Sequence, residues 1–340
     1  MLRDVSWDNF SHQQSKQVQI ITQGDDNGLM SITAKYFHPL IPVVLFGDHT
    51  CNVKYIDFDC QIIGDGVKLL TWKDKNLCLR FLYYVIYNAA KKFPQGYARH
   101  LSTLKEAECF LPTNEIQLKI ATTLSHLDTN ISILNSLIFK YEAIKKSTVN
   151  LLLEPKNDWK EILLGDIGDV LMCKRILKDQ TTKTGDVPFY KIGTFGKIPD
   201  SFISRALFDD FKQRFAYPQK GDVLLSAAGT IGRTVVFNGE DAYFQDSNIV
   251  WIDNDESLVI NSFLYVLYSQ MDWQTENGGT VSRLYNSNIR NTRVTIPSLK
   301  EQKRIVAILD SIDGTIRNLK SQLVKTQNIK EGMMSYFFGK

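Results

Sequence analysis

The sequence predicts an α+β fold with two strand-rich domains, each followed by a long helix. The two helices are predicted to pair as an antiparallel coiled coil with pseudo-two-fold symmetry. Residues 111–128 and 296–313 share an aliphatic residue before Pro, a Gln six positions after it, and an aliphatic–Asp ending. In both segments, apolar residues recur with the 3.5-residue period of a coiled-coil seam. The segments before the helices repeat more weakly, since "FLYYVIY" (81–87) resembles "FLYVLY" (263–268).

The repeat divides the chain into four consecutive parts. Residues 1–110 are expected to form the first domain and 111–153 the first long helix. Residues 154–296 then form the second domain and 297–340 the second long helix. The boundary between the halves is "EPKNDW" (154–159), in which Pro and Asn interrupt regular structure.

Short apolar runs predict strands in both domains. In the first domain, "IPVVLFGDHT" (41–50) and "IIGDGVKLL" (62–70) resemble "KGDVLLSAAGT" (220–230) and "YFQDSNIVWI" (243–252) of the second. Each run is bounded by Gly, Asp or Asn, as is typical of strands. "SLVINSFLYVLYSQM" (257–271) is predicted to be a buried helix.

The two long helices are predicted to pack through one apolar face each. Pro112 and Pro297 suit the first turn of a helix, because proline fixes φ and lacks only an N–H that would be unpaired there. Two unrelated amphipathic helices are the alternative, but a shared register favours a duplicated unit. Counterparts in the two seams lie 185 positions apart. The expected pairing residues are Ile120, Leu124, Leu127, Ile131, Leu134, Ile138, Ile305, Leu309, Ile312, Ile316, Leu319 and Leu323.

Composition is that of a globular protein and excludes several other classes. Apolar residues make up 44% and charged residues 23% of the chain, as in ordinary globular domains. A net charge of +3 does not by itself indicate a nucleic-acid partner. The five cysteines form no C-x-x-C pair, which argues against a zinc ribbon or a disulfide framework and fits a reducing cytoplasm. A polar N-terminal stretch and the lack of a membrane-length apolar run predict a cytoplasmic protein without membrane contact.

The sequence carries no recognisable motif for catalysis or for cofactor binding. There is no Walker A, G-x-G-x-x-G, H-E-x-x-H or G-x-S-x-G motif, and the five histidines show no metal-ligand spacing. Asp200, Asp210 and Lys212 loosely fit a metal-dependent nuclease pattern, although such a pattern often arises by chance. We therefore expect no catalytic residue, no metal site and no cofactor in this chain.

Several motifs occur in the same order in both halves of the chain. The second half contains "WKEILLGDI" (159–167), "KGDVLLSAAGTIGR" (220–233), "QDSNIVWI" (245–252) and "IPSLKEQKRIVAILDSID" (296–313), and the first half contains "PVVLFGDHT" (42–50), "GDGVKLL" (64–70) and "LPTNEIQLKIATTLSHLD" (111–128). In this order they resemble the DNA-specificity (S) subunit of type I restriction–modification systems. They are also similar to the separate specificity subunits of related two-target systems.

This resemblance, which covers nearly the whole chain, implies a non-catalytic function. Each strand-rich part is then a target-recognition domain that reads one half of a split target in double-stranded DNA. The paired helices set the distance between the half-sites and dock two modification (methyltransferase) subunits, and restriction (endonuclease/translocase) subunits join the complex. S-adenosylmethionine and ATP are used by these partner subunits.

The first domain departs from the family pattern near its N-terminal side. Trp159 to Gly221 spans 62 residues, whereas the nearest counterpart, Trp7 to Gly47, spans 40, and no "LGDI" follows Trp7. The first domain is therefore expected to be shortened or divergent in this region.

Candidate DNA-binding residues follow from the chemistry of base edges and phosphates. Arg contacts guanine and Asn or Gln contacts adenine, whereas Lys, Arg and backbone N–H groups contact phosphates. A Gly-rich turn at Gly229 and Gly232 would bring N–H groups close to phosphate beside Arg233, or these glycines only shape a hairpin. The main candidates are His49, Lys54, Arg99, His100, Lys191, Lys197, Arg205, Arg214, Gly229, Thr230, Gly232, Arg233, Arg283 and Arg290, and weaker candidates are Lys91, Lys92, Lys212 and Arg293. For each of these, the alternative is a solvated surface residue.

Two other classes of protein compete with the resemblance. A stand-alone nuclease or methyltransferase is disfavoured because no catalytic motif is present. A coiled-coil scaffold without DNA binding would not need two strand-rich domains of different sequence.

Overall fold

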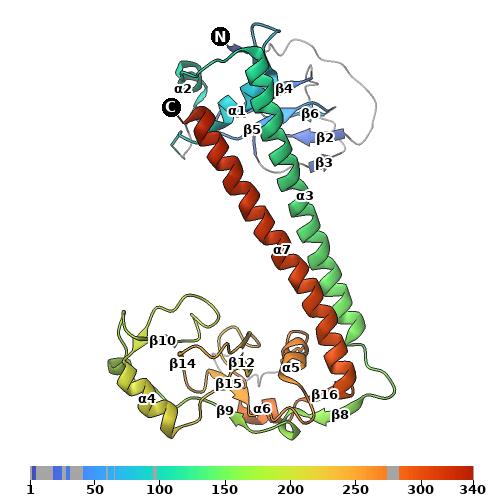
Figure 1. The fold of residues 1–340 in the computed structure, drawn as a ribbon, viewed down its shortest axis with the longest axis vertical. Helices are drawn as coiled ribbons and strands as arrows, with labels where there is room; N and C mark the ends of the chain where they lie inside the picture. Colours follow the sequence, from blue (N-terminus) through green and yellow to red (C-terminus); the bar gives the residue numbers. More distant parts are fainter. Residues whose placement is uncertain are drawn as a thin grey trace. The chain divides into compact units, whose positions relative to one another are not determined.

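The computed structural model describes residues 2–4, 18–24, 28–30, 41–58, 60–64, 66–94, 98–273 and 283–339. The chain forms two compact units. The first unit comprises Met1–Ile138 and Asn318–Lys340, and the second comprises Phe139–Arg317. Two long helices, α3 (Asn114–Leu152) and α7 (Leu299–Phe338), each contribute one part to each unit (Figure 1).

The first unit contains a four-stranded sheet and a three-stranded sheet. The four-stranded sheet has the order β1-β7-β4-β5, with all neighbours antiparallel. In the smaller sheet, of order β3-β2-β6, β2 is antiparallel to β3 and parallel to β6. The elements are β1 (Leu2–Asp4), β2 (Val18–Ile21), β3 (Gly28–Met30), β4 (Val43–Gly47), β5 (Val53–Ile56), β6 (Gln61–Ile62), β7 (Val67–Trp72), α1 (Leu79–Ala90) and α2 (Leu101–Glu106).

The second unit repeats both sheets. Its four-stranded antiparallel sheet has the order β13-β12-β15-β9, and its smaller sheet, β11-β10-β14, again combines one antiparallel and one parallel pair. A two-stranded sheet pairs β16 with β8. The elements are β8 (Lys160–Leu163), η1 (Leu164–Asp166), β9 (Val170–Leu171), η2 (Lys178–Gln180), β10 (Val187–Tyr190), β11 (Phe202–Ile203), α4 (Arg205–Arg214), β12 (Val223–Ser226), β13 (Thr234–Val236), β14 (Tyr243–Phe244), β15 (Ile249–Ile252), α5 (Asn261–Tyr268), α6 (Asn286–Arg290) and β16 (Arg293–Ile296).

The matching strand orders confirm the duplication and the α+β fold predicted from the sequence. In the two four-stranded sheets, β4 corresponds to β12, β7 to β15 and β5 to β13, and each pair of counterparts has the same antiparallel neighbours. Helix α1 follows β7 as α5 follows β15, as the shared "FLY" segments predicted. The duplicated sequence therefore encodes a duplicated domain.

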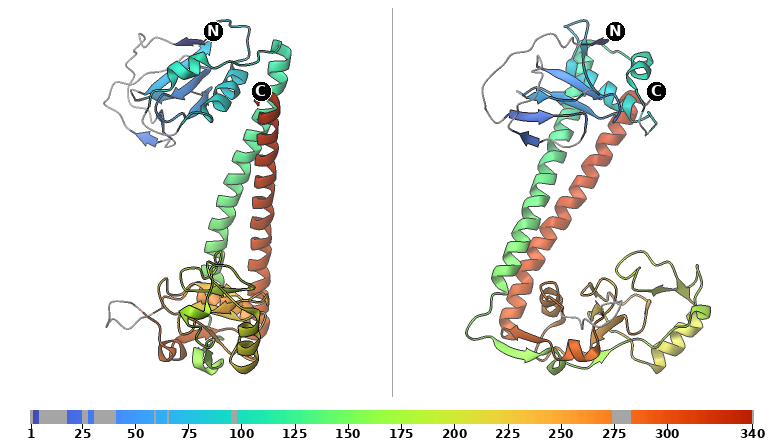
Figure 2. Two further views of the ribbon diagram at one scale, coloured as in Figure 1. Left: turned by 90° about the vertical axis from the view of Figure 1, so that its left-hand side faces the viewer. Right: turned by 180° about the vertical axis from the view of Figure 1, so that it is seen from behind.

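The central strands are apolar without interruption because both faces of the four-stranded sheets are covered. In β4, Val44 and Phe46 belong to the apolar core shared with α1, whereas Val43 and Leu45 belong to a second core on the opposite face. Period-two alternation of side chains assigns neighbouring residues to opposite faces. Figure 2 shows α1 lying between the four-stranded sheet and α3 in the first unit.

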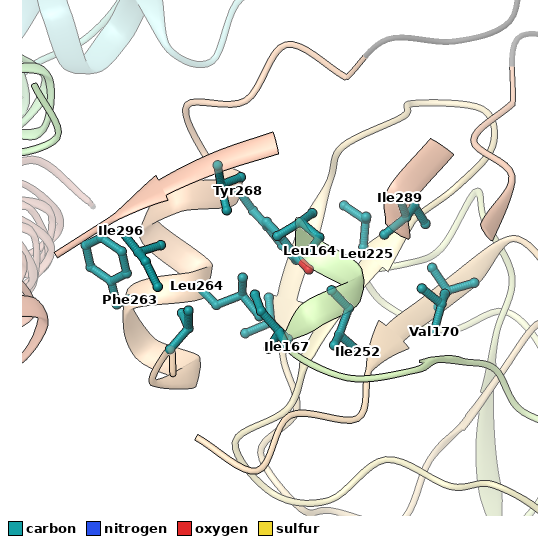
Figure 3. Packing of buried hydrophobic residues seen from close by; sticks show 14 of the residues in the cluster. Leu164, Ile167, Val170, Leu225, Ile252, Phe263, Leu264, Tyr268, Ile289 and Ile296 are labelled. Atoms are coloured by element: carbon teal, nitrogen blue, oxygen red, sulfur yellow. The ribbon is translucent and has the colours of Figure 1, made fainter. Parts of the chain in front are cut away.

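Figure 3 shows the corresponding core of the second unit. Leu164 and Ile167, in and just after η1, lie in the middle of a cluster that includes Val170 of β9, Ile252 of β15 and Phe263 of α5. The same cluster includes residues of α3 and α7, so the long helices form one core with the domain. A domain that shares its core with two helices is held on them by the hydrophobic effect.

The sequence comparison of Trp7 with Trp159 is not tested by the structure, because Trp7 lies outside the described residues. Strand β1 pairs with β7 as β9 pairs with β15, so β1 and β9 are counterparts. Trp7 follows β1, whereas Trp159 precedes β9. In the second unit, β16 is paired with β8, but residues 108–111, at the corresponding place before α3, form no strand.

In each unit, α3 and α7 run antiparallel. In the first unit, Lys330 pairs with Asp128, and Met334 shares a core with Leu124. A later residue of α7 therefore lies beside an earlier residue of α3, as expected of antiparallel helices. In the second unit, Lys145 pairs with Asp313, and a core further along contains residues from both helices, including Val149, Ile305 and Leu309.

The predicted seam residues are all buried or half-buried. Because the helices are antiparallel, Ile120 and Leu124 share a core with the end of α7, and Ile305 and Leu309 share one with the end of α3. The seam therefore serves two cores, one in each unit.

We expect Leu124→Ala to lower the free energy of unfolding by about 2–5 kcal/mol, because a fully buried leucine leaves a cavity when truncated. Ile133→Ala is the matched control on the same helix, since Ile133 is half exposed, and its effect should stay within about 0.5 kcal/mol. Urea denaturation followed by circular dichroism measures both. Equal losses in the two variants would contradict the assignment of Leu124 to a core.

Candidate nucleic-acid interface

One buried glutamine attaches each domain to its long helix. Gln117 and Gln302 both have an exposed fraction of 0%. The side-chain oxygen of Gln117 accepts the N–H of Cys78, the N-cap of α1, over 3.1 Å. The side-chain oxygen of Gln302 accepts the N–H of Ile260, the N-cap of α5, over 3.0 Å. The repeated Gln of the sequence is therefore a joint between domain and helix.

The prolines of the repeat belong to the same joint. The amide of Gln117 donates to the carbonyl of Pro112 over 2.8 Å, and that of Gln302 donates to Pro297 over 3.0 Å. Gln302 also donates to the carbonyl of Leu258 over 2.9 Å. The prolines precede the first helical residue by two positions, so they lie just outside the first turn in which they were predicted.

Four loops of the second domain lie next to one another, and together we call them the loop cluster. The N–H of Ile192 donates to the side-chain oxygen of Gln245 over 3.0 Å. Arg233 Nη1 donates to the carbonyl of Phe195 over 3.0 Å. These bonds join loops that are far apart in the sequence. The loop cluster consists of residues 191–201, 227–233, 245–248 and 283–285.

Arg283 and Leu284 join the loop at residues 283–285 to two other loops of the cluster. Arg283 Nη2 donates to the carbonyl of Ser247 over 2.7 Å, and the next residue, Leu284, donates its N–H to Ala227 over 2.8 Å. Among the described residues, neither Arg233 nor Arg283 has a carboxylate partner. Each guanidinium therefore keeps its positive charge and further N–H donors at a fixed place.

The glycine-rich turn of the cluster is shaped by packing. Gly229 and Gly232 have φ values of +65° and +84°, which favour glycine. A Cβ on Gly232 would lie 2.6 Å from the ring of Trp273. The N–H of Gly232 donates to the carbonyl of Ser226, and the N–H of Arg233 donates to Ser226 Oγ. These N–H groups are used inside the turn, so the geometry favours the hairpin interpretation over a phosphate cradle.

Two candidate residues of the loop cluster are exposed to solvent. Thr230 and Lys197 both lie on the surface. In the part of the chain that the structure describes, Lys197 has no carboxylate partner. Trp273, which packs on Gly232 and on Tyr268, was not singled out from the sequence, because only the folded turn brings it there.

The other basic candidates of the second domain are engaged in ion pairs. Exposed ion pairs contribute little to stability, but each carboxylate cancels positive charge that would attract phosphate. The hydrogen bond from Arg205 holds the pKa of Asp241 below its usual range, and Lys191 does the same for Asp200. The pairs are Lys191–Asp200 at 2.8 Å, Arg205–Asp241 at 2.5 Å, Lys212–Asp241 at 3.3 Å, Arg214–Asp210 at 3.0 Å, Arg290–Asp169 at 2.6 Å and Arg293–Glu161 at 2.5 Å.

The same ion pairs argue against a nuclease site at Asp200, Asp210 and Lys212. Asp200, Asp210 and Lys212 each bind a different partner, so they do not converge on one site. Across the described residues there is no group of three or more His, Cys, Asp or Glu that could hold a metal ion. No helix in this part of the chain is long and apolar enough to span a membrane.

In the first domain, His100 is not a surface residue. It is 4% exposed and its ring stacks on Phe93 at 5.5 Å. The backbone N–H of His100 donates to Asp48 Oδ1 over 2.8 Å, and the same oxygen accepts the backbone N–H of Leu101. These two hydrogen bonds anchor the start of α2. The structure therefore does not place His100 at the surface, where a DNA contact was predicted, because its ring is packed against Phe93.

The remaining candidates of the first domain lie at the surface or brace it. Lys54 Nζ donates to the carbonyls of Thr22 and Gly24, so it links the two sheets. His49 Nδ1 lies 3.2 Å from the carbonyl of Ala98. Arg99 is exposed, and the residues that the structure describes offer it no carboxylate. Of the weaker candidates, Lys91 lies over the ring of Tyr87 and Lys92 is exposed.

Comparison with known proteins agrees with this architecture. The family model of the type I restriction modification DNA specificity domain matches residues 8–141 and 156–326. The chain belongs to this family. A solved S subunit of a type I restriction-modification system from M. genitalium has a TM-score of 0.67 at 17% identity, with 99% of this chain and 93% of that chain covered. This likeness shows the same fold.

Two curated relatives are specificity subunits. A putative type I restriction enzyme specificity subunit of Haemophilus influenzae is 57% identical over 174 residues, which are 51% of this chain and 44% of the relative. The type I restriction enzyme specificity subunit of Escherichia coli is 21% identical over 328 residues, or 87% of this chain and 78% of the relative. The match to the Haemophilus protein thus spans less than half of its length.

We expect Gln302→Leu to lower the free energy of unfolding by at least about 2 kcal/mol, because buried polar groups left without partners cost roughly 1–3 kcal/mol each. The substitution leaves the N–H of Ile260 and the carbonyls of Pro297 and Leu258 without the amide. Gln327→Leu, at an exposed position of the same helix, is the control. Chemical denaturation compares them, and a Gln302→Leu protein as stable as the control would refute the joint.

Proposed function

We propose that this protein is the DNA-specificity subunit of a restriction–modification complex and that it binds double-stranded DNA at a target in two parts. One observation carries the proposal: the same two-sheet domain occurs twice, and a buried glutamine joins each copy to a long helix. Two copies of one fold with different surface loops suit two half-sites of different sequence. The family to which the chain belongs supports this function.

In the second domain, the loop cluster is the proposed DNA surface. Base recognition needs side chains held rigidly at the groove edge, and Arg is the commonest partner of guanine. Arg233 and Arg283 meet this need, because each is anchored to a backbone carbonyl and has no neutralising carboxylate among the described residues. Lys197, exposed and unpaired in the same part of the structure, suits a phosphate contact.

The paired candidates have a weaker claim to direct contact. Arg205, Arg214 and Arg290 would have to exchange a carboxylate for a phosphate. In the first domain, Arg99 and His49 flank the turns after β4 and before α2, at the place that corresponds to the loop cluster. We propose these two as the contact residues of the first half-site.

Exposed apolar side chains on the long helices support the docking of two identical partners. Ile144 and Leu151 of α3 are exposed, and their counterparts 185 positions later, Ile329 and Tyr336 of α7, are exposed as well. Residues seven apart lie on one side of a helix. The second unit therefore carries one such surface and the first unit an equivalent one. We propose that each surface docks one modification (methyltransferase) subunit.

The chemistry of the complex is assigned to its partner subunits. We propose that S-adenosylmethionine and ATP are bound by the modification and restriction subunits and that this chain contributes no catalytic group. The assembly would work in the cytoplasm, where DNA is its substrate.

The DNA proposal is tested with the complex reconstituted from this chain and its modification subunit. Its target is first found by sequencing the DNA that the complex selects. Arg233→Gln and Arg283→Gln should then weaken binding to that target about 5- to 150-fold, since one base contact is worth roughly 1–3 kcal/mol. Fluorescence anisotropy at fixed salt measures the dissociation constants.

The matched control for this experiment is Arg214→Gln. Arg214 is exposed and paired with Asp210 on α4, and it makes none of the contacts that join the loop cluster. The dissociation constant of the Arg214→Gln complex for its DNA target should therefore change less than about twofold. Unfolding curves verify that the variants stay folded. Unchanged affinity in folded Arg233→Gln and Arg283→Gln proteins would reject the loop cluster as the DNA surface. Selection of no DNA at all would reject the function and leave a scaffold.

The docking proposal predicts a change in stoichiometry. Ile144→Asp with Leu151→Asp should remove one apolar surface and leave its copy on α7 intact, so native mass spectrometry should show one modification subunit per chain in place of two. Ile133→Asp is the control, because Ile133 is exposed but its counterpart on α7 is Asn318, a polar residue. Two bound subunits in the double variant would exclude this surface.

A further inference from the structure

Each long helix has one lysine in its apolar seam, at the same place in both. Lys145 lies seven residues beyond Ile138, and Lys330 lies seven residues beyond Leu323, so both continue the seam. Both are half-buried, as are the other seam positions toward the helix ends. The seam positions of α3 are 117, 120, 124, 127, 131, 134, 138, 141, 145, 148 and 152, and those of α7 lie 185 residues later. All of these positions are described, and these two lysines are the only charged residues among them.

Each seam lysine binds an aspartate of the opposite helix. Lys330 Nζ lies 2.5 Å from Asp128 Oδ1 in the first unit, and Lys145 Nζ lies 2.7 Å from Asp313 Oδ1 in the second. The two lysines are 185 positions apart, and so are the two aspartates. The duplication has therefore kept both partners of one ion pair.

The surroundings of the first pair tie it to the domain as well. Tyr84 of α1 donates its hydroxyl to Asp128 Oδ2 over 2.7 Å, and the ammonium group of Lys330 lies 4.9 Å from the ring centre of Tyr87. The side chain of Lys330 is only 14% exposed. A lysine this covered loses much of its hydration, so its place in the seam has a cost in stability.

An apolar seam alone does not define one alignment of two helices. Leu and Ile repeat every heptad, so a slide by seven residues, about 10 Å at 1.5 Å per residue, again places apolar residues opposite each other. The same slide would leave each seam lysine and its aspartate without a partner. A polar residue at one seam position specifies alignment in coiled coils at some cost in stability.

We infer that the ion pairs Lys145–Asp313 and Lys330–Asp128 are positioning residues that, together with the cores shared by both helices, fix one register of α3 against α7. The inference deepens the proposed function, because a unique register gives a unique length of helix between the joints at Gln117 and Gln302. A unique length in turn gives one spacing between the two DNA half-sites.

The register itself is measured without DNA. Spin labels on p-acetylphenylalanine at two exposed positions of the second unit, 146 and 317, leave the native cysteines in place. Pulsed electron–electron double resonance should give one distance for the natural sequence. In a variant with both lysines changed to Leu and both aspartates to Asn, a second population shifted by up to about 10 Å should appear.

Two control variants separate charge pairing from general repacking of the seam. Thr148→Leu with Thr326→Leu also makes two half-buried seam positions apolar, but it leaves the ion pairs intact, so one distance should remain. Lys145→Arg with Lys330→Arg keeps the charges and should also keep one distance. If the four-substitution variant does not fold, Lys145→Leu with Asp313→Asn tests the second unit alone.

The second readout is the spacer of the selected DNA. In complex with the modification subunit, the four-substitution variant should accept targets of more than one spacer length, whereas both control variants keep one. A single unchanged distance in the folded variant would overturn the inference. If the natural complex selects no DNA but the distances behave as expected, the proposed function fails and the register assignment stands.

Discussion

Each domain of this protein depends on one fully buried amide. Gln117 and Gln302 are held by the cap of a domain helix on one side and by a proline carbonyl on the other. Burying an amide is favourable only when its donor and acceptor groups are satisfied together. The joint therefore permits one orientation of the domain on its helix, and the apolar cores that join domain and helix are built around it.

The two halves share the elements that attach each domain to its helix, although the β8–β16 pair of the second has no counterpart strand at residues 108–111. Strand orders, glutamine joints and interhelical ion pairs recur in both. The turns do not. In the first domain, buried Asp48 anchors α2, whereas the corresponding region of the second domain is a glycine turn packed on Trp273. Shared attachment with unlike turns fits the proposed recognition of two half-sites of different sequence.

Elements with a periodic signal could be predicted from the sequence. The helices, the seam and the duplicated strands follow from hydrophobic spacing, which is local. His100 was assigned to the surface because its burial under Phe93 depends on tertiary packing. The role of the glycine turn depended on which N–H groups were already bonded. The pairing of the seam lysines was not predicted, because the search for a seam considered only apolar residues. Their aspartate partners lie on the other long helix, far away in the sequence.

The division of both long helices between the units has a consequence for the order of folding during synthesis. The second unit is one continuous segment, Phe139–Arg317, so all of its residues are available before the chain is finished. The first unit also needs Asn318–Lys340, whose Met334 lies in its core. On the ribosome, where domains usually fold in chain order, the N-terminal domain must wait for the last helical turns. Its apolar face therefore stays uncovered until residues 318–340 have been synthesised.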